Sequence, residues 1–425
     1  MRQGSLFARN VAVLLSGELL SRGLTFVAFA RLARLLEPAS YGQVEVALAA
    51  VMFATLVVDL GLSTLGTRDI AARRADVPRL IRQVVSAQLL LAIVVYPLLA
   101  LLLIGCRVDA SLTQLLLGFA VSIFGLPFLL YWVFQGRNHM TPVAVLQVLR
   151  QSVFVAMTFI VVRAPAHLFR LPWAEILAVA VAAAGYVALL RRSGESPRVN
   201  LRAGCDLQLL REGLPIGGSQ LVWASRMYLP IILLAACSGQ AVIGFFGAAH
   251  RMVMVGQTLL TVYFATLFPV MSEASFRSAD ALAALLRRSM RWVLWPMVAL
   301  AAMTTVAAPP VMRLVFGSQF AQASTTLAVL VWVLPMLAWR RHHRNALIAL
   351  NHQGEELACS LFGLAVLVWL TLQLGSRYGA VGGAWAMVIS ELAGAVVTWW
   401  RLKRHLPAYR LPQPAVGGAF ARHSQ

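Results

Sequence analysis

Charged residues are scarce in this sequence: they make up 12% of its 425 residues, whereas hydrophobic residues make up 60%. A soluble domain of ordinary composition has about 25% charged residues. So little polar surface cannot cover a water-soluble globule of this size. The composition therefore excludes a soluble protein and favours an integral membrane protein.

Acidic residues are scarcer than basic ones: the sequence has 16 Asp+Glu against 36 Lys+Arg and a net charge of +20. In a soluble protein this excess would indicate binding to nucleic acid. Here the basic residues, almost all of them arginine, lie mainly in short segments between apolar runs. Positive cytoplasmic loops explain that pattern in a membrane protein, so no nucleic-acid partner is expected.

Motifs of catalysis and metal binding are also missing from the sequence: it has no nucleophile elbow, HExxH helix, Walker loop or dinucleotide fingerprint. The cysteines lack the spacing of a disulfide framework or a zinc site; they are Cys106, Cys205, Cys237 and Cys359. We therefore expect no catalytic residue, no metal site and no cofactor. The basic start of the chain leads into an apolar run without a cleavage site, and we interpret that run as a first membrane helix.

Long apolar runs dominate what is present. A helix needs about 20 mainly apolar residues to cross a bilayer, and twelve segments qualify. They are 11–34, 43–65, 84–105, 112–134, 143–163, 172–190, 214–236, 243–270, 291–315, 321–339, 356–374 and 380–400. With the N-terminus inside, about 25 basic residues fall on the cytoplasmic side and about 7 outside, which favours cytoplasmic termini.

The two halves of the chain resemble each other. Arg22 lies in the middle of the first predicted helix and Arg226 in the middle of the seventh, while Gly42 and Gly244 open the helices that follow. Two parallel repeats predict an all-α membrane protein with two pseudo-symmetric six-helix lobes around a central cavity, which would transport by rocking of the lobes. The expected parts are an N-lobe (1–192), a cytoplasmic linker (193–212) and a C-lobe with a cytoplasmic tail (213–425).

Four arginines interrupt the apolar segments: Arg22, Arg150, Arg226 and Arg251. Each would cost roughly 2.5–3.5 kcal/mol if it faced lipid, so they are expected to face a shared interior. The planar guanidinium suits phosphate, which makes all four candidate sites for an anionic substrate. Glu18 lies four residues before Arg22 on the same helix face and is expected to position it. The alternatives are hydrogen bonds from the arginines to neighbouring helices and a Glu18–Arg22 salt bridge of purely structural value.

Carboxylates inside the predicted spans are candidates for binding a coupling proton or Na⁺. Asp59, Glu45 and Glu391 are the three that we select. Asp59 has a structural alternative, since it precedes a basic loop and would also serve as a cap. The cluster 340–344, with sequence RRHHR, is interpreted as an anchor at anionic headgroups rather than a metal or pH-sensing site.

Several stretches resemble the polysaccharide-export branch of the multidrug/oligosaccharidyl-lipid/polysaccharide flippase superfamily, which includes O-antigen flippases. They are ARLLEPASYGQVEVALA (33–49), VDLGLSTLGTRDIA (58–71), YWVFQGRNHMTPVAV (131–145), SGQAVIGFFGAAHRM (238–252) and ATLFPVMSEAS (265–275). The resemblance implies a flippase in the bacterial inner membrane that moves an undecaprenyl-pyrophosphate-linked oligosaccharide from the cytoplasmic to the periplasmic leaflet. Its implied partners are membrane lipids and, beyond these, polysaccharide polymerase or ligase proteins.

Two other functions stay open at this point. A multidrug or cation antiporter of the same superfamily would line its cavity with carboxylates and aromatic residues, whereas the charge within these spans is mainly positive. A membrane enzyme that polymerises or transfers lipid-linked sugars would need a long loop with acidic residues, and none stands out in the sequence.

Overall fold

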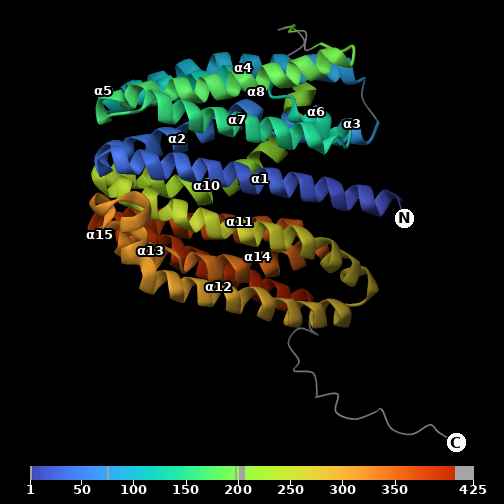
Figure 1. Ribbon diagram of the computed structural model, residues 1–425. Helices are drawn as coiled ribbons and strands as arrows, with labels where there is room; N and C mark the ends of the chain where they lie inside the picture. The colour runs from blue at the N-terminus through green and yellow to red at the C-terminus, as the bar shows by residue number, and fades with distance from the viewer. Residues whose placement is uncertain (1, 74–75, 197–198, 201–205, 407–425) are drawn as a thin grey trace, which may run out of the picture.

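All regular elements in the described part of the chain are helices (Figure 1). The computed structural model describes residues 2–73, 76–196, 199–200 and 206–406. The long helices run side by side in one bundle, with α4 and α8 at one side of the view and α12 at the other (Figure 1). The all-α membrane fold predicted from the sequence is confirmed.

We use the name N-lobe for the elements from α1 to α8 and the name C-lobe for those from α10 to α15. The N-lobe contains α1 (Arg2–Leu35), α2 (Pro38–Asp59), α3 (Leu62–Ala71), α4 (Val77–Gly105), α5 (Ala110–Ala120), η1 (Val121–Phe128), α6 (Tyr131–Gly136), α7 (Met140–Val161), η2 (Pro165–Arg170) and α8 (Leu171–Arg192). The C-lobe contains α10 (Leu207–Cys237), α11 (Gln240–Arg277), α12 (Ala279–Phe316), η3 (Ser318–Phe320), α13 (Ala323–Leu330), α14 (Val333–Ala349) and α15 (Gln353–His405).

Within the described residues, 11 helical segments are long and apolar enough to cross a membrane. The last of these, α15, has 53 residues and would be about 80 Å long if straight, far more than the ~30 Å hydrocarbon core. Its helical geometry is interrupted at Gly379, with φ 57° and ψ −130°. The chain reverses there, because His405 Nε2 lies 2.6 Å from Glu355 Oε1 at the other end. The two halves of α15 correspond to the last two of the twelve predicted spans.

Two predicted spans are broken by local backbone geometry. The span 43–65 is wrong at its end, since α2 stops at Asp59 and the chain turns through left-handed conformations at Leu60 and Gly61. The span 112–134 is one crossing made of α5, η1 and α6, with Pro127 inside the irregular middle part. A proline removes a backbone donor and disfavours a continuous helix.

The predicted linker 193–212 is shorter at its C-terminal end than expected. The α10 helix begins at Leu207, and the Asp206 side chain caps it by accepting hydrogen bonds from the amides of Gln208 and Leu209. Residues 197–198 and 201–205 of this linker lie outside the described part.

The lobes pack tightly where α2 crosses α11. A Cβ on Gly42 would collide with the carbonyl of Gln240, and one on Gly244 would collide with the carbonyl of Pro38. Small residues let membrane helices approach this closely. At the same end Gln319 Nε2 donates to the Leu36 carbonyl at 2.9 Å, so C-lobe and N-lobe are joined there by hydrogen bonds as well.

Candidate binding cavity between the lobes

A cavity of about 480 Å³ lies between the lobes. Its walls come from α1, α2, α7 and α8 of the N-lobe and from α10 and α11 of the C-lobe. The polar residues that line it are Glu18, Arg22, Thr25, Glu45, Arg150, Gln151, Glu175, Tyr228, His250, Arg251 and Thr258. Three of the four arginines selected from the sequence are thus brought together in one space.

Arg22 is paired within its own helix. Its Nε donates to Glu18 Oε1 at 2.6 Å, which is the i,i+4 pairing expected from the sequence. The second oxygen of Glu18 accepts from Gln147 Nε2 at 2.5 Å, so α7 holds the carboxylate in place. Gly17 lies opposite Ala144, with room for no more than a hydrogen, and this close contact of α1 with α7 fixes the position of the pair.

Arg150 on α7 forms an ion pair with Glu175 on α8. The arginine side chain is 37% exposed and the glutamate 18% exposed, so the pair lies at the edge of the cavity rather than in the packed core. We did not select Glu175 from the sequence, although a carboxylate within the predicted sixth span is by itself a signal of function. It is the partner that sequence reasoning missed.

Arg251 is the most enclosed arginine of the cavity, with 14% of its side chain exposed. Its Nε and Nη2 donate to the two oxygens of Glu45, at 2.5 and 3.1 Å. The guanidinium also lies over the ring of Phe29, 3.1 Å from the ring centroid. Stacking together with a bidentate carboxylate fixes the guanidinium plane in the cavity.

Arg226 does not line the cavity. It is only 4% exposed and pairs with Glu391 at 2.5 Å inside the C-lobe. Its Nη1 donates to the Ser360 carbonyl, and Arg340 approaches the other oxygen of Glu391 at 3.4 Å. Arg226 therefore bonds to a neighbouring helix and does not contact the cavity. Glu391 is paired with two arginines.

Two further sequence interpretations have a structural outcome. Asp59 caps the turn into α3, since its carboxylate accepts from the amides of Gly61 and Ser63. The interpretation of the cluster 340–344 as a headgroup anchor is wrong for its buried members: Arg340 lies against Glu391, and His342 hydrogen-bonds to Ser289 within the C-lobe at 2.8 Å. Long-range packing of α14 against α12 and α15 encloses these side chains.

The cavity carries three arginines and three glutamates, paired one to one. The charges of these six side chains cancel, because the arginines and the glutamates are equal in number. A guanidinium that leaves a carboxylate can bind a phosphate oxygen in the same bidentate manner. The arrangement is therefore suited to exchange a built-in carboxylate for an anionic group of a ligand.

Two solved structures show the class of fold. The chain is similar to an inward-facing multidrug resistance transporter of the MATE family in the MOP superfamily, with a TM-score of 0.74, 16% identity, and coverage of 94% of this chain and 99% of that one. It is also similar to the lipid II flippase MurJ in an inward closed conformation, with a TM-score of 0.77, 14% identity, and coverage of 92% and 87%. The protein therefore has the same fold as these two solved transporters.

The sequence comparisons show the family of the chain. A family model for polysaccharide biosynthesis proteins matches residues 7–275, more than half of the chain, and the protein belongs to this family. A relative from Shigella dysenteriae, named "Putative O-antigen transporter", is 24% identical over 242 residues, which are 56% of this chain. The match spans 61% of the length of that relative. The protein is a multi-pass membrane protein of the polysaccharide biosynthesis family.

Proposed function

We propose that the protein is a flippase that moves an undecaprenyl-pyrophosphate-linked oligosaccharide from the cytoplasmic to the periplasmic leaflet. The observation that carries the proposal is the cavity in which Arg22, Arg150 and Arg251 meet, in a chain of the polysaccharide biosynthesis family. In this proposal the arginines bind the diphosphate, the sugars occupy the wet cavity, and the lipid tail stays in the bilayer. No covalent bond changes.

In this proposal the arginines of the ion pairs bind the diphosphate, and the carboxylates that they leave couple this binding to cations. A diphosphate linking a lipid to a sugar has about two negative charges, and it displaces carboxylates from the arginines because its oxygens match the guanidinium fork. The freed carboxylates would otherwise be unpaired in a partly buried site, which is costly. Uptake of protons or Na⁺ by Glu18, Glu45 and Glu175 restores the charge balance. Substrate binding is thereby coupled to cation binding.

Hydrogen bonds between the lobes at one end of the bundle support the direction of transport. Arg34 Nε on α1 donates to the Val315 carbonyl at 3.0 Å, and Gln319 donates to the Leu36 carbonyl, so the two lobes are tied together there. The cytoplasmic side assigned by the arginine-rich loops is the opposite end. A cavity that is closed toward the periplasm is the state that would receive substrate from the cytoplasmic leaflet.

The multidrug antiporter has less support than the flippase. The MATE neighbour shares 16% identity, which reports the fold and not the substrate, whereas the family match and the Shigella relative concern polysaccharides. Every carboxylate of the cavity is already paired with an arginine, which leaves no free acid for a drug cation. The MATE neighbour and the Shigella relative are both transporters by name, so we do not propose an enzyme.

The proposal is tested by mass spectrometry of lipid extracts from cells that lack the protein. We expect a defined oligosaccharide to accumulate on undecaprenyl pyrophosphate, and the wild-type gene to relieve the accumulation. The wild-type gene and an Arg22→Ala gene are compared at equal protein level in the membrane. Normal carrier lipids together with altered resistance to cationic drugs would contradict the proposal and favour the antiporter.

A further inference from the structure

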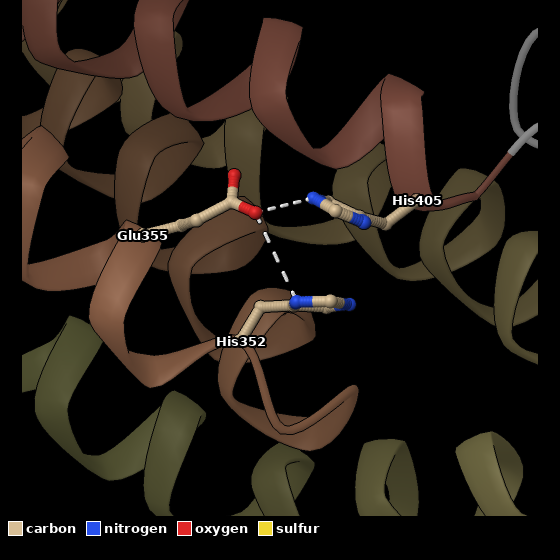
Figure 2. Close-up of side chains that lie close together, drawn as sticks. All are labelled: His352, Glu355 and His405. Atoms are coloured by element: carbon tan, nitrogen blue, oxygen red, sulfur yellow. Dashed lines mark hydrogen bonds and ion pairs between the residues drawn. The ribbon is translucent and has the colours of Figure 1, made fainter.

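A cluster of His352, Glu355 and His405 lies where the two ends of α15 meet (Figure 2). His352 is the residue before α15, Glu355 is in its first turn, and His405 is its last residue. The reversal of the chain at Gly379 brings these positions together. None of the three residues lines the cavity between the lobes.

Figure 2 shows one carboxylate oxygen of Glu355 facing a nitrogen of each of the two imidazole rings. One atom from each residue, two imidazole nitrogens and a carboxylate oxygen, lies within 4.8 Å of the other two. Glu355 Oε1 is 2.6 Å from His405 Nε2 and 3.9 Å from His352 Nδ1. In a tetrahedral site with bonds of about 2.0–2.2 Å, donor atoms are roughly 3.3–3.5 Å apart. The observed distances lie on both sides of that value, so the side chains must rotate to bind an ion.

The surroundings of the cluster bear on how an ion would bind. The rings of His352 and His405 are stacked with centroids 3.7 Å apart. Because an imidazole lone pair lies in the plane of its ring, one ring must turn out of this stack for both to bind the same ion. Glu355 Oε2 is buried without a hydrogen-bond partner, and Arg401 Nη1 is 3.6 Å away, too far for a hydrogen bond. This carboxylate therefore has one oxygen that no hydrogen bond from the described residues holds in place.

We propose that His352, Glu355 and His405 bind one divalent transition-metal ion of the Zn²⁺ class. Two imidazoles and one carboxylate form a borderline donor set that suits Zn²⁺, and the partly exposed site leaves a fourth position for water. The ion joins the beginning and the end of α15 and so stabilises the last two membrane crossings as a hairpin. The sequence predicted no metal site because His405 lies fifty residues beyond Glu355, outside any linear ligand spacing.

The rival interpretation is a plain hydrogen-bonded ion pair between His405 and Glu355. The test uses the full-length protein in detergent micelles, purified without a polyhistidine tag, loaded with Zn²⁺ and desalted. Bound zinc is measured by elemental analysis for the wild type, His405→Gln and His139→Gln. His139 is exposed at the start of α7, remote in sequence from the cluster, and serves as the matched histidine control.

We expect about one zinc per chain in the wild type and in His139→Gln, and at least a tenfold loss of affinity in His405→Gln. Zinc should also raise the melting temperature of the wild type but not of His405→Gln, since a ligand stabilises only the state that binds it. If His405→Gln cannot be purified, His352→Gln removes a ligand while keeping the 2.6 Å contact, and the same loss is expected. Equal zinc in all variants, or none in the wild type, would overturn the proposal.

Discussion

Glu45 and Arg251 form a bidentate ion pair that joins the N-lobe to the C-lobe across the cavity. Glu45 is on α2 and Arg251 is on α11, the two helices whose close crossing holds the lobes together. The side chain of Glu45 fits because Gly247 has no Cβ; one placed there would be 2.5 Å from Glu45 Cγ. In the proposed mechanism a diphosphate that takes Arg251 from Glu45 also releases this contact between the lobes. Binding of the substrate would then break the same ion pair that holds the two lobes together.

Removing one member of this pair should cost more than removing both. Arg251→Gln leaves a buried carboxylate without its partner, and losses of about 3–5 kcal/mol are typical of such changes. The double variant Glu45→Gln/Arg251→Gln should recover most of the thermal stability, measured by melting of the purified protein, because no buried charge remains. It should not recover export. A double variant that exports normally would exclude Arg251 from the proposed diphosphate site.

Arg22→Ala should lower export by about tenfold or more without loss of protein from the membrane, because a charge-assisted hydrogen bond to the substrate is lost. Arg22→Lys keeps the charge but not the planar fork, so partial export is expected. Accumulated lipid-linked oligosaccharide, normalised to protein level, measures both. The control is Arg277→Ala, which removes an exposed pair at the end of α11 and should have no effect. Full export by Arg22→Ala would remove this residue from the site.

The sequence indicated the internal repeat, but it did not show whether the mid-helix arginine of each half faces the cavity. Gly42 and Gly244 stood out as equivalent residues, and the structure gives them equivalent roles in the crossing of α2 and α11. Arg22 and Arg226 looked equally equivalent. One faces the cavity, whereas the other is enclosed because α10 packs against α15.

The partner of Arg226, Glu391, is 165 residues away, so no local pattern could reveal the pairing. The sequence correctly predicted two apolar spans on either side of the reversal within α15. It did not show what causes the reversal. Gly379 takes a positive φ, which a glycine adopts at little cost, and the sequence around it contains other glycines that remain helical. Tertiary contacts, not sequence periodicity, decide which polar side chains meet in this bundle.

Arg226→Ala should lower the stability of the protein, whereas Arg22→Ala should lower export. Arg226→Ala leaves Glu391 with Arg340 as its one ion-pair partner among the described residues, at 3.4 Å, in a site that is almost fully buried. We expect a loss of several kcal/mol in stability and a lower amount of protein in the membrane, as is usual when a buried pair is broken. Immunoblotting of membranes and thermal melting measure the effect. A normal protein level combined with abolished export would instead favour a direct role of Arg226 in transport.

Gly244→Ala should disturb the crossing of the lobes. The added methyl group collides with the backbone of Pro38, which cannot move aside as a flexible side chain would. Overpacking of this kind typically costs about 1–3 kcal/mol, and here it would also weaken the closed end of the cavity. Gly218→Ala is the matched control, since a Cβ at this helical glycine has no heavy atom of another residue nearby. Equal melting temperatures and export for the two variants would show that the close crossing is not required.

The charge balance of the cavity predicts how transport responds to ion gradients. Glu175→Gln removes the carboxylate that neutralises Arg150, so one fewer cation is needed when the diphosphate enters. Binding should become tighter, and flipping in proteoliposomes should depend less on an imposed proton or Na⁺ gradient than in the wild type. Asp59→Asn is the comparison, because Asp59 caps α3 through Gly61 and Ser63 and does not line the cavity. That variant should melt at a lower temperature while its gradient response stays unchanged. The reverse result, with the response lost in Asp59→Asn and retained in Glu175→Gln, would transfer the coupling role from the cavity to Asp59.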